Sequence, residues 1–347
     1  MKAISLIVTG LAAFILTYVL VPLNIKLSYK YGLHDHPHDR GIHKEKVPNT
    51  GGLSFALTVI ILQIIFIFVF PDYSERLIPF VIIGFLITVL GFFDDIKGCN
   101  YKLKLFFQVL VILTAYYLGF QIEILTNPFG QDIYLGFMSL PVTVVWFLLV
   151  INAMNLIDGL DGLASGISII VALVLLVIGL NSNNFIVALL SVMLMFSNIA
   201  FLRYNFYPAK IFMGDTGSMF LGLNIASISV IGTFQIKGIT TITLIIPLLA
   251  LGIPISDFIM AISRRIKNKK NIFHADKEHI HHQLLESGLN QREIAIISYM
   301  ITLLFGLIAI GFSFVSKDIV LLILIFLYFI LAFFLFLLLK FHKKRDK

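Results

Sequence analysis

Long apolar runs separated by short polar segments make up most of this sequence. A helix needs about 20 mainly apolar residues to cross the hydrocarbon core of a membrane, because lipid offers no hydrogen-bond partner to an exposed backbone amide. About eleven runs have close to this length, so the pattern predicts an all-α polytopic membrane protein. We expect transmembrane helices at residues 3–24, 52–70, 77–93, 103–120, 139–154, 163–180, 184–202, 217–234, 239–262, 294–315 and 318–340.

Composition strengthens this interpretation. Hydrophobic residues make up 59% of the chain and charged residues only 13%, and the mean hydropathy is +0.98. In a soluble domain about a quarter of the residues are charged. The predicted helices leave no room for a large soluble domain, so residues 1–347 are expected to form one integral membrane domain. The single cysteine, Cys99, excludes an intramolecular disulfide.

Basic residues lie almost entirely on one set of loops. Of the 26 lysines and arginines, the exceptions are Lys2, Arg76, Lys237 and Lys317. The positive-inside rule then places the protein in the cytoplasmic membrane with its N-terminus outside and its C-terminus in the cytoplasm. Residues 263–293 form the large cytoplasmic loop in this arrangement. Orientation and attraction to anionic lipid headgroups explain the net charge of +7, so it does not indicate nucleic-acid binding.

One segment on the outer side, residues 121–137, has a different pattern. Ile122, Ile124, Ile133 and Leu135 alternate with polar residues around an Asn-Pro-Phe-Gly turn at 127–130. Alternation with a period of two across such a turn is typical of paired strands. The pattern predicts a short external β-hairpin.

Most of the 19 acidic residues, and all nine histidines, fall on the cytoplasmic side. A carboxylate at the bilayer centre costs about 2.5–3.5 kcal/mol on insertion scales, so acids are expected at the ends of spans. Three acidic clusters occur there. They are Asp94-Asp95 after the third span, Asn152–Asp161 after the fifth, and Asp215 at the start of the eighth.

These clusters have the composition of a magnesium and phosphate site. Two adjacent carboxylates repel each other unless they share a cation, and oxygen-bearing side chains suit Mg²⁺, which completes its shell with water and phosphate oxygens. The glycines beside Asp215 let backbone amides at a helix N-terminus approach an anion. Helix capping is the alternative for each cluster taken alone, but the repetition on one face favours a site.

A histidine group, His279-Ile-His281-His282, lies in the large cytoplasmic loop. Its spacing does not match HExxH and no cysteine accompanies it, so contacts to phosphate or substrate are favoured over zinc. Asp257 is the one acid away from the ends of a span, and it follows Pro247 and Pro254. Because prolines break a helix, this carboxylate is expected to face a cavity.

The clusters resemble the motifs of the polyprenyl-phosphate N-acetylhexosamine-1-phosphate transferases, the family of MraY, WecA and TagO. The resemblance covers nearly the whole chain. The family's paired aspartates match Asp94 and Asp95. Its N-x-x-N-x-x-D-G-x-D-G-L-A string is intact at 152–164, and its F-x-G-D-x-G-S string at 212–218.

The loops are most similar to the WecA/TagO branch. His43 precedes Pro48 and Gly51-Gly52 as in that branch, and the histidine group lacks the three consecutive histidines of MraY. One position departs from the branch: Gly41 stands where a lysine is usual. Lys44 is therefore the expected replacement for a phosphate contact.

The resemblance implies transfer of N-acetylglucosamine-1-phosphate from UDP-N-acetylglucosamine to undecaprenyl phosphate, with release of UMP. This is the first membrane step in making cell-envelope glycopolymers such as teichoic acid or O-antigen. By the same resemblance, Asn155 and Asp215 would bind Mg²⁺, with Mn²⁺ as the alternative cation. The catalytic residues would be Asp94, Asp95 and Asp158, and the substrate contacts Lys44, Asn152, Asp161, Phe212, His279, His281 and His282.

Asp161 and Phe212 are the residues expected at the uracil, the latter by stacking. Direct attack by the lipid phosphate is favoured over a covalent aspartyl intermediate, because the acceptor is already an anionic nucleophile. Three alternatives remain open: an MraY-type phospho-MurNAc-pentapeptide transferase, a transferase for another UDP-N-acetylhexosamine, and a membrane transporter. A transporter places ionisable groups near mid-bilayer, where only Asp257 fits. The resemblance also allows a homodimer.

Overall fold

The computed structural model describes residues 2–35, 46–125, 132–233, 265 and 289–312. Short 3₁₀ turns, η1 (Pro71–Tyr73) and η2 (Gly136–Met138), precede α3 and α5. The α-helices are α1 (Lys2–Tyr31), α2 (Gly52–Val69), α3 (Ser74–Lys97), α4 (Tyr101–Tyr117), α5 (Ser139–Ile157), α6 (Leu163–Asn181), α7 (Phe185–Asn205), α8 (Gly214–Thr233) and α12 (Gln291–Phe312).

The described helices form the bundle that the apolar runs predict. Seven of them, within the described part of the chain, are long and apolar enough to cross a membrane: α1, α2, α3 with its 3₁₀ turn, α5 with its own, α6, α7 and α12. The expected spans at 239–262 and 318–340 lie outside the described residues, as does Asp257. An all-α polytopic membrane fold is therefore confirmed in this part of the chain.

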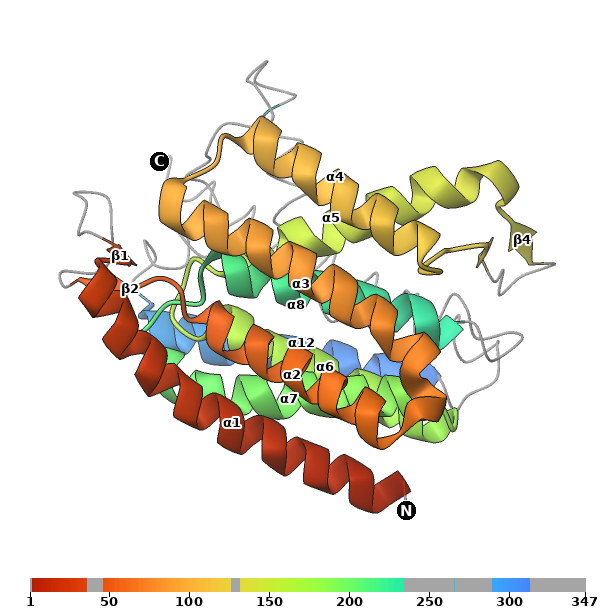
Figure 1. The fold of residues 1–347 in the computed structure, drawn as a ribbon, viewed down its shortest axis with the longest axis horizontal. Coiled ribbons are helices and arrows are strands. Elements are labelled where there is room, and N and C mark those ends of the chain that lie inside the picture. The colour runs from red at the N-terminus through yellow and green to blue at the C-terminus, as the bar shows by residue number, and fades with distance from the viewer. Residues whose placement is uncertain (1, 36–45, 126–131, 234–264, 266–288, 313–347) are drawn as a thin grey trace, which may run out of the picture.

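Helix α8 lies in the middle of the bundle, in contact with α2, α3, α5, α6 and α7 (Figure 1). Its buried polar residues, Ser218, Asn224, Ser227 and Ser229, face protein, and the Ser227 hydroxyl donates to the Leu223 carbonyl at 2.8 Å. Since protein surrounds α8, it does not need the apolar surface of a lipid-facing helix.

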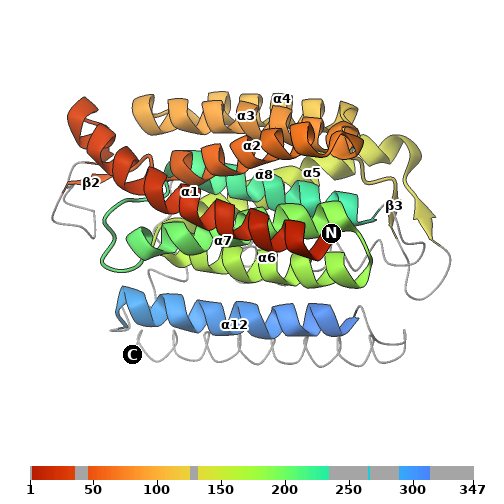
Figure 2. The same ribbon diagram turned by 60° about the horizontal axis from the view of Figure 1, so that its bottom comes forward.

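Apolar side chains divide between a packed interior and a lipid-facing exterior. In the interior, the ring of Phe55 lies 5.2 Å from that of Phe201 and 6.2 Å from that of Phe220, measured between centroids. On the exterior, α1 exposes Ile4, Ile7, Leu11 and Ile15. Their spacing of three to four residues forms one helix face. Figure 2 shows α12 packed along α6.

The predicted hairpin at 121–137 is confirmed where the structure describes it. Strands β3 (Ile124–Leu125) and β4 (Ile133–Tyr134) are antiparallel, with Ile124 opposite Tyr134 and Leu125 opposite Ile133. A second pair, β1 (His34–Asp35) with β2 (Val47–Pro48), lies at the other end of the bundle. At that end α3, α5 and α7 finish, and α4, α6, α8 and α12 begin. Because successive helices run in opposite directions, the loops that carry the acidic clusters lie at this same end of the bundle (Figures 1 and 2).

Candidate active site

The turn between α3 and α4 places a lysine over the first of the paired aspartates. Gly98, with φ at 65°, ends α3, and the amide of Cys99 donates to Asp94 Oδ1 at 2.6 Å. The side chain of Asn100 then caps the first turn of α4. The chain reverses direction so tightly that Lys104, in the first turns of α4, lies beside Asp94.

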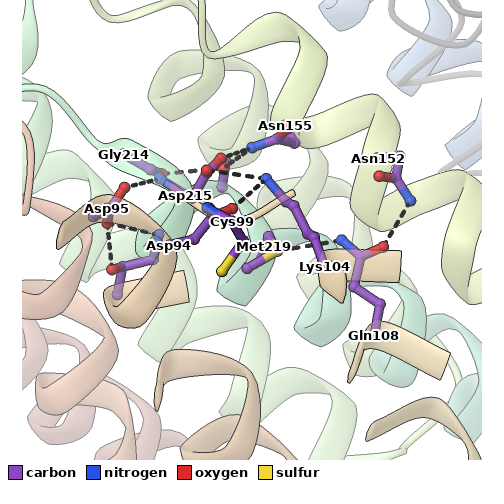
Figure 3. A network of polar contacts seen from close by, with 12 residues as sticks. Asp94, Asp95, Cys99, Lys104, Gln108, Asn152, Asn155, Gly214, Asp215 and Met219 are labelled. Carbon is purple, nitrogen blue, oxygen red and sulfur yellow. Dashed lines mark hydrogen bonds and ion pairs between the residues drawn. The ribbon is translucent and has the colours of Figure 1, made fainter. Parts of the chain in front are cut away.

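Lys104 bridges two acidic clusters that are far apart in the sequence. Its Nζ lies 2.9 Å from Asp94 Oδ2 and 3.0 Å from Asp215 Oδ2 (Figure 3). The side chains are mostly buried, with 17% of Lys104, 6% of Asp94 and 29% of Asp215 exposed. At this depth the Coulomb attraction is stronger than in bulk water, so one ammonium group offsets much of the charge of two carboxylates.

Lys104, Asp94 and Asp215 form the centre of the candidate site, and Asn155 joins this centre from α5. Its Nδ2 donates to Asp215 Oδ1 and to the hydroxyl of Ser218 at 2.9 Å. Asp215 and Ser218 lie one turn apart at the start of α8 and therefore point to the same side. The two residues expected to hold a metal are thus in direct contact (Figure 3).

Asp95 takes a different direction from Asp94. Its carboxylate accepts hydrogen bonds from the backbone amides of Asp215, at 2.6 Å, and Thr216, at 3.0 Å. The hydroxyl of Thr216 donates to the same carboxylate. The expectation that amides at this helix N-terminus meet an anion is therefore fulfilled by a carboxylate of the chain itself. These two amides are not free for a substrate phosphate.

Backbone segments approach closely enough around α8 to require glycine. Gly214 has φ at 70°, and a Cβ there would lie 2.0 Å from the carbonyl oxygen of Asn49. A Cβ on Gly52 would lie 2.1 Å from the amide nitrogen of Gly217. The amide of Gly52 also donates to the Met213 carbonyl at 2.8 Å. The Gly51-Gly52 pair of the motif thus lets the start of α2 lie directly against the start of α8.

Asn152 lies one turn deeper than Asn155 and contacts a different helix. Its Nδ2 donates to Gln108 Oε1 at 3.2 Å and to the Leu148 carbonyl at 2.8 Å. Gln108 in turn donates to the sulfur of Met219 at 3.2 Å. Figure 3 shows Asn152 and Gln108 beside the aspartate cluster rather than within it. Asn152 therefore ties α5 to α4 in the layer below the centre.

Asp158 lies in the turn that follows α5 and is half-buried. The backbone amide of Gly214 and the carboxylates of Asp215 and Asp95 lie near it. Burial raises the pKa of Asp158 well above its ordinary value, the carboxylates of Asp215 and Asp95 raise it further, and the Gly214 amide opposes this. Asp158 thus belongs to the same acidic cluster as Asp95 and Asp215.

Asp161 is buried, with 3% of its surface exposed. Its Oδ2 accepts a hydrogen bond from the amide of Ala209 at 2.9 Å and so holds the loop that carries Phe212. The next residue, Gly162, has φ at 75°, and its carbonyl accepts from the hydroxyl of Tyr299 at 2.6 Å. Helix α12 thereby fixes the turn between α5 and α6.

The structure brings together Asp94, Asp95, Asn155, Asp158 and Asp215 of the expected site residues. Phe212 is half-buried in the segment before α8, where its amide donates to the Pro48 carbonyl at 2.8 Å. The residues that lie outside the described part of the chain are Lys44, His279, His281 and His282.

We expected no role for three residues of the centre, Lys104, Thr216 and Ser218, although Lys104 follows the paired aspartates as in sequences of the family that the chain resembles. For Lys104 a signal was present, because it is a lysine near the start of an otherwise apolar helix, directly after the paired acids. A charged group in that position requires a partner. Ser218 also carried a signal, as the last residue of the F-x-G-D-x-G-S string. Thr216 carried none, since threonine is common in helices that pack against protein.

The donors at Asn155 and Asp215 fit a magnesium ion by their chemistry. Carboxylate, amide and hydroxyl oxygens suit a hard cation, which needs few protein ligands when phosphates and water supply the rest. Here Nδ2 of Asn155 faces Asp215, so its oxygen turns toward a shared cation only when the amide group is reversed. The described residues contain no group of three or more histidine, cysteine, aspartate or glutamate side chains arranged to hold a metal.

Comparison with known proteins yields one family and many similar proteins. The family described as "Glycosyl transferase family 4" matches residues 77–233, which include every described part of the centre. A Bacillus subtilis protein, a probable undecaprenyl-phosphate N-acetylglucosaminyl 1-phosphate transferase, is 36% identical over 311 residues. The match covers 89% of this chain and 85% of that protein.

Two other relatives differ from each other in the sugar that their names give. A Thermotoga maritima undecaprenyl-phosphate alpha-N-acetylglucosaminyl 1-phosphate transferase is 32% identical, over 88% of this chain and 89% of its own. A phospho-N-acetylmuramoyl-pentapeptide-transferase from Caldicellulosiruptor bescii is 31% identical, over 89% of this chain and 96% of its own. All three matches extend over most of both chains.

Proposed function

The chain belongs to glycosyl transferase family 4, and we propose that it transfers N-acetylglucosamine-1-phosphate from UDP-N-acetylglucosamine to undecaprenyl phosphate. The products are undecaprenyl-diphosphate-N-acetylglucosamine and UMP. The observation that carries the proposal is the centre in which Lys104 joins Asp94 to Asp215 and Asn155 contacts Asp215. It lies at one end of an apolar bundle, where a soluble nucleotide sugar meets a phosphate anchored in lipid.

The reaction joins two anions. An oxygen of the lipid phosphate attacks the phosphorus that carries the sugar, and the bond from that phosphorus to UMP breaks. Positive charge and alignment are the main requirements of such a transfer. Lys104 supplies a fixed ammonium group at the centre, and Asp94 beside it is placed to accept or position a proton of the lipid phosphate. Mg²⁺ held by Asp215 and Asn155, or Mn²⁺ in its place, offsets phosphate charge when bound.

The donor is expected to be UDP-N-acetylglucosamine rather than UDP-MurNAc-pentapeptide. The proteins named as N-acetylglucosaminyl 1-phosphate transferases include the B. subtilis relative at 36% identity, whereas the phospho-N-acetylmuramoyl-pentapeptide-transferase from C. bescii is 31% identical. The histidine group that distinguishes the branches lies outside the described residues. For the uracil, contacts by Asp161 and Phe212 stay predictions, supported by the hydrogen bond from Ala209 that joins their two segments.

A transfer assay tests the function directly. Purified protein in detergent with undecaprenyl phosphate and Mg²⁺ is expected to release UMP from UDP-N-acetylglucosamine and to form a lipid-linked sugar. UDP-N-acetylgalactosamine and UDP-MurNAc-pentapeptide serve as competing donors in parallel reactions. A preference for the pentapeptide donor would move the chain to the MraY-type reaction. Absence of UMP release with every donor, together with solute uptake into proteoliposomes, would favour the transporter.

The orientation of the bundle is also a proposal: the end that carries the centre faces the cytoplasm. It is supported by the placement of all but four of the basic residues. Because the chain has one cysteine, a Cys99→Ser background allows single labels to be placed at each end.

Exposed positions at the two ends should label in opposite ways. Lys97→Cys lies beside the centre and Tyr134→Cys lies in the hairpin, and both positions are exposed. A maleimide that does not cross membranes is expected to label Tyr134→Cys in intact cells and Lys97→Cys only after permeabilisation. Labelling of Lys97→Cys in intact cells would place the centre outside.

A further inference from the structure

Helix α8 begins without a capping residue of its own. The first amides of a helix have no partner within it and are usually satisfied by a serine, threonine, aspartate or asparagine just before the first turn. The residues before Gly214 are Ile211, Phe212 and Met213, none of which has a side-chain acceptor suited to a cap. The cap comes instead from another helix, through Asp95 at the end of α3.

Both oxygens of this carboxylate are in use. Oδ1 accepts from the amide of Asp215 at 2.6 Å, and Oδ2 accepts from the amide of Thr216 at 3.0 Å and from its hydroxyl. A Cβ on Gly214 would lie 2.7 and 2.8 Å from these two oxygens. The glycine is therefore what allows the carboxylate to reach the helix end, and Asp95 fits that space closely.

Asp94 and Asp95 are adjacent but point to different groups. Successive residues on an α-helix are rotated by about 100°, as 3.6 residues per turn require. Asp94 accordingly pairs with Lys104, whereas Asp95 pairs with the backbone of α8. Asp94 faces the charged centre, whereas the carboxylate of Asp95 is occupied by donors at the start of α8 (Figure 3).

We propose that Asp95 is a positioning residue for the transfer reaction: by capping α8 from α3, it fixes the backbone from which Asp215 reaches Asn155 and Lys104. Its carboxylate does not take a proton from substrate. This assignment rests on the proposed function and deepens it, because it divides the paired aspartates into one residue facing the centre and one supporting it.

Two substitutions at Asp95 separate capping from proton transfer. Asp95→Asn retains an acceptor for the amide of Asp215, but its NH2 group cannot accept from the amide of Thr216, so the substitution weakens the cap without removing it. Asp95→Glu retains the charge, but its extra methylene group forces the carboxylate into the space beside Gly214. A positioning role predicts that Asp95→Asn is the more active variant. A base predicts the reverse, because only glutamate still accepts a proton.

The expected values are distinct as well. For Asp95→Asn we expect kcat at saturating Mg²⁺ to stay within about threefold of wild type. The half-activating Mg²⁺ concentration should rise about tenfold, because a weakened cap typically shifts the equilibrium of the capped helix end by about one order of magnitude. A loss of kcat above about a hundredfold, with Asp95→Glu more active than Asp95→Asn, would overturn the proposal.

Hydrogen exchange tests the cap without any assay of turnover. In a peptide covering residues 212–220, the amides of Asp215 and Thr216 are expected to exchange faster in Asp95→Asn by about tenfold. Asp94→Asn is the matched control, with exchange at these amides unchanged. Equal exchange in wild type and Asp95→Asn would contradict the cap. If no donor yields UMP with wild-type protein, the proposed function fails, but this exchange result still decides the cap.

Thr216→Val gives a second test in case Asp95→Asn does not fold. It removes one donor to the Asp95 carboxylate and leaves both amides in place. Faster exchange at residues 215–216, with kcat at saturating Mg²⁺ retained, supports the proposal. Unchanged exchange together with a loss of kcat above about a hundredfold would overturn the positioning role.

Discussion

Asp215→Asn is expected to reduce UMP release by about a hundred- to a thousandfold, the range for losing one strong electrostatic contact in an active site. Asp215 is the acid at which the contacts of the centre converge. Lys104 lies 3.0 Å from it, and Asn155 donates to its other oxygen. The substitution retains the size of the side chain, so the bundle should assemble normally. Asn155→Ala should have a comparable effect, because it removes the second proposed metal ligand.

The controls for this prediction come from the same helix. Ser227 is buried in α8, several turns from the centre, and its hydroxyl only donates to the Leu223 carbonyl. Ser227→Ala should therefore retain turnover and membrane insertion. Thermal unfolding in detergent shows whether each variant is folded. Near-normal UMP release by both Asp215→Asn and Asn155→Ala would exclude the metal assignment.

Lys104→Met is expected to lose both turnover and stability. It leaves Asp94 and Asp215 without their shared cation, and breaking a buried ion pair by removing one partner costs about 3–5 kcal/mol. The cost should be at the low end because 29% of the Asp215 side chain is exposed. A lower melting temperature in detergent and a loss of UMP release of at least about a hundredfold are the measurements.

A double variant separates these two effects. In Lys104→Met with Asp94→Asn, one of the uncompensated carboxylates is removed, so the melting temperature should rise toward that of wild type while turnover stays low. Lys102→Met is the matched control, because Lys102 is exposed on the same helix, and exposed substitutions usually change stability by less than about 0.5 kcal/mol. A fully active Lys104→Met would show that this ammonium group has no part in transfer.

The apolar runs and the turn signals predicted much of the fold. The hairpin is an example: alternation at Ile122, Ile124 and Ile133 predicted strands that the structure pairs as β3 and β4. Several helix boundaries also agree closely, such as α2 at Gly52–Val69 against an expected span of 52–70, whereas α1 continues to Tyr31 beyond the expected end at 24. Such features depend on local chemistry, and a single sequence reports local chemistry well.

Contacts between distant segments were harder to predict. The three acidic clusters were expected to meet, since alternating spans bring their ends to one face. The direction of each side chain was not predictable, because it depends on how far α3 is rotated against α8. Asp95 shows this: in the sequence it is indistinguishable from Asp94, yet it binds backbone amides at residues 215 and 216.

Asp94 has its partner nearby in the sequence, whereas Asp95 has its partners far along the chain, so the two carboxylates are paired at different times during synthesis. Lys104 and Asp94 come from consecutive helices joined by a short turn. This pair is complete as soon as α3 and α4 have been synthesised, so Asp94 enters the membrane already neutralised. The donors to Asp95 belong to α8 and are made much later. A nascent chain that lacks α8 would therefore leave the Asp95 carboxylate without these backbone donors, although its neighbour Asp94 is already paired.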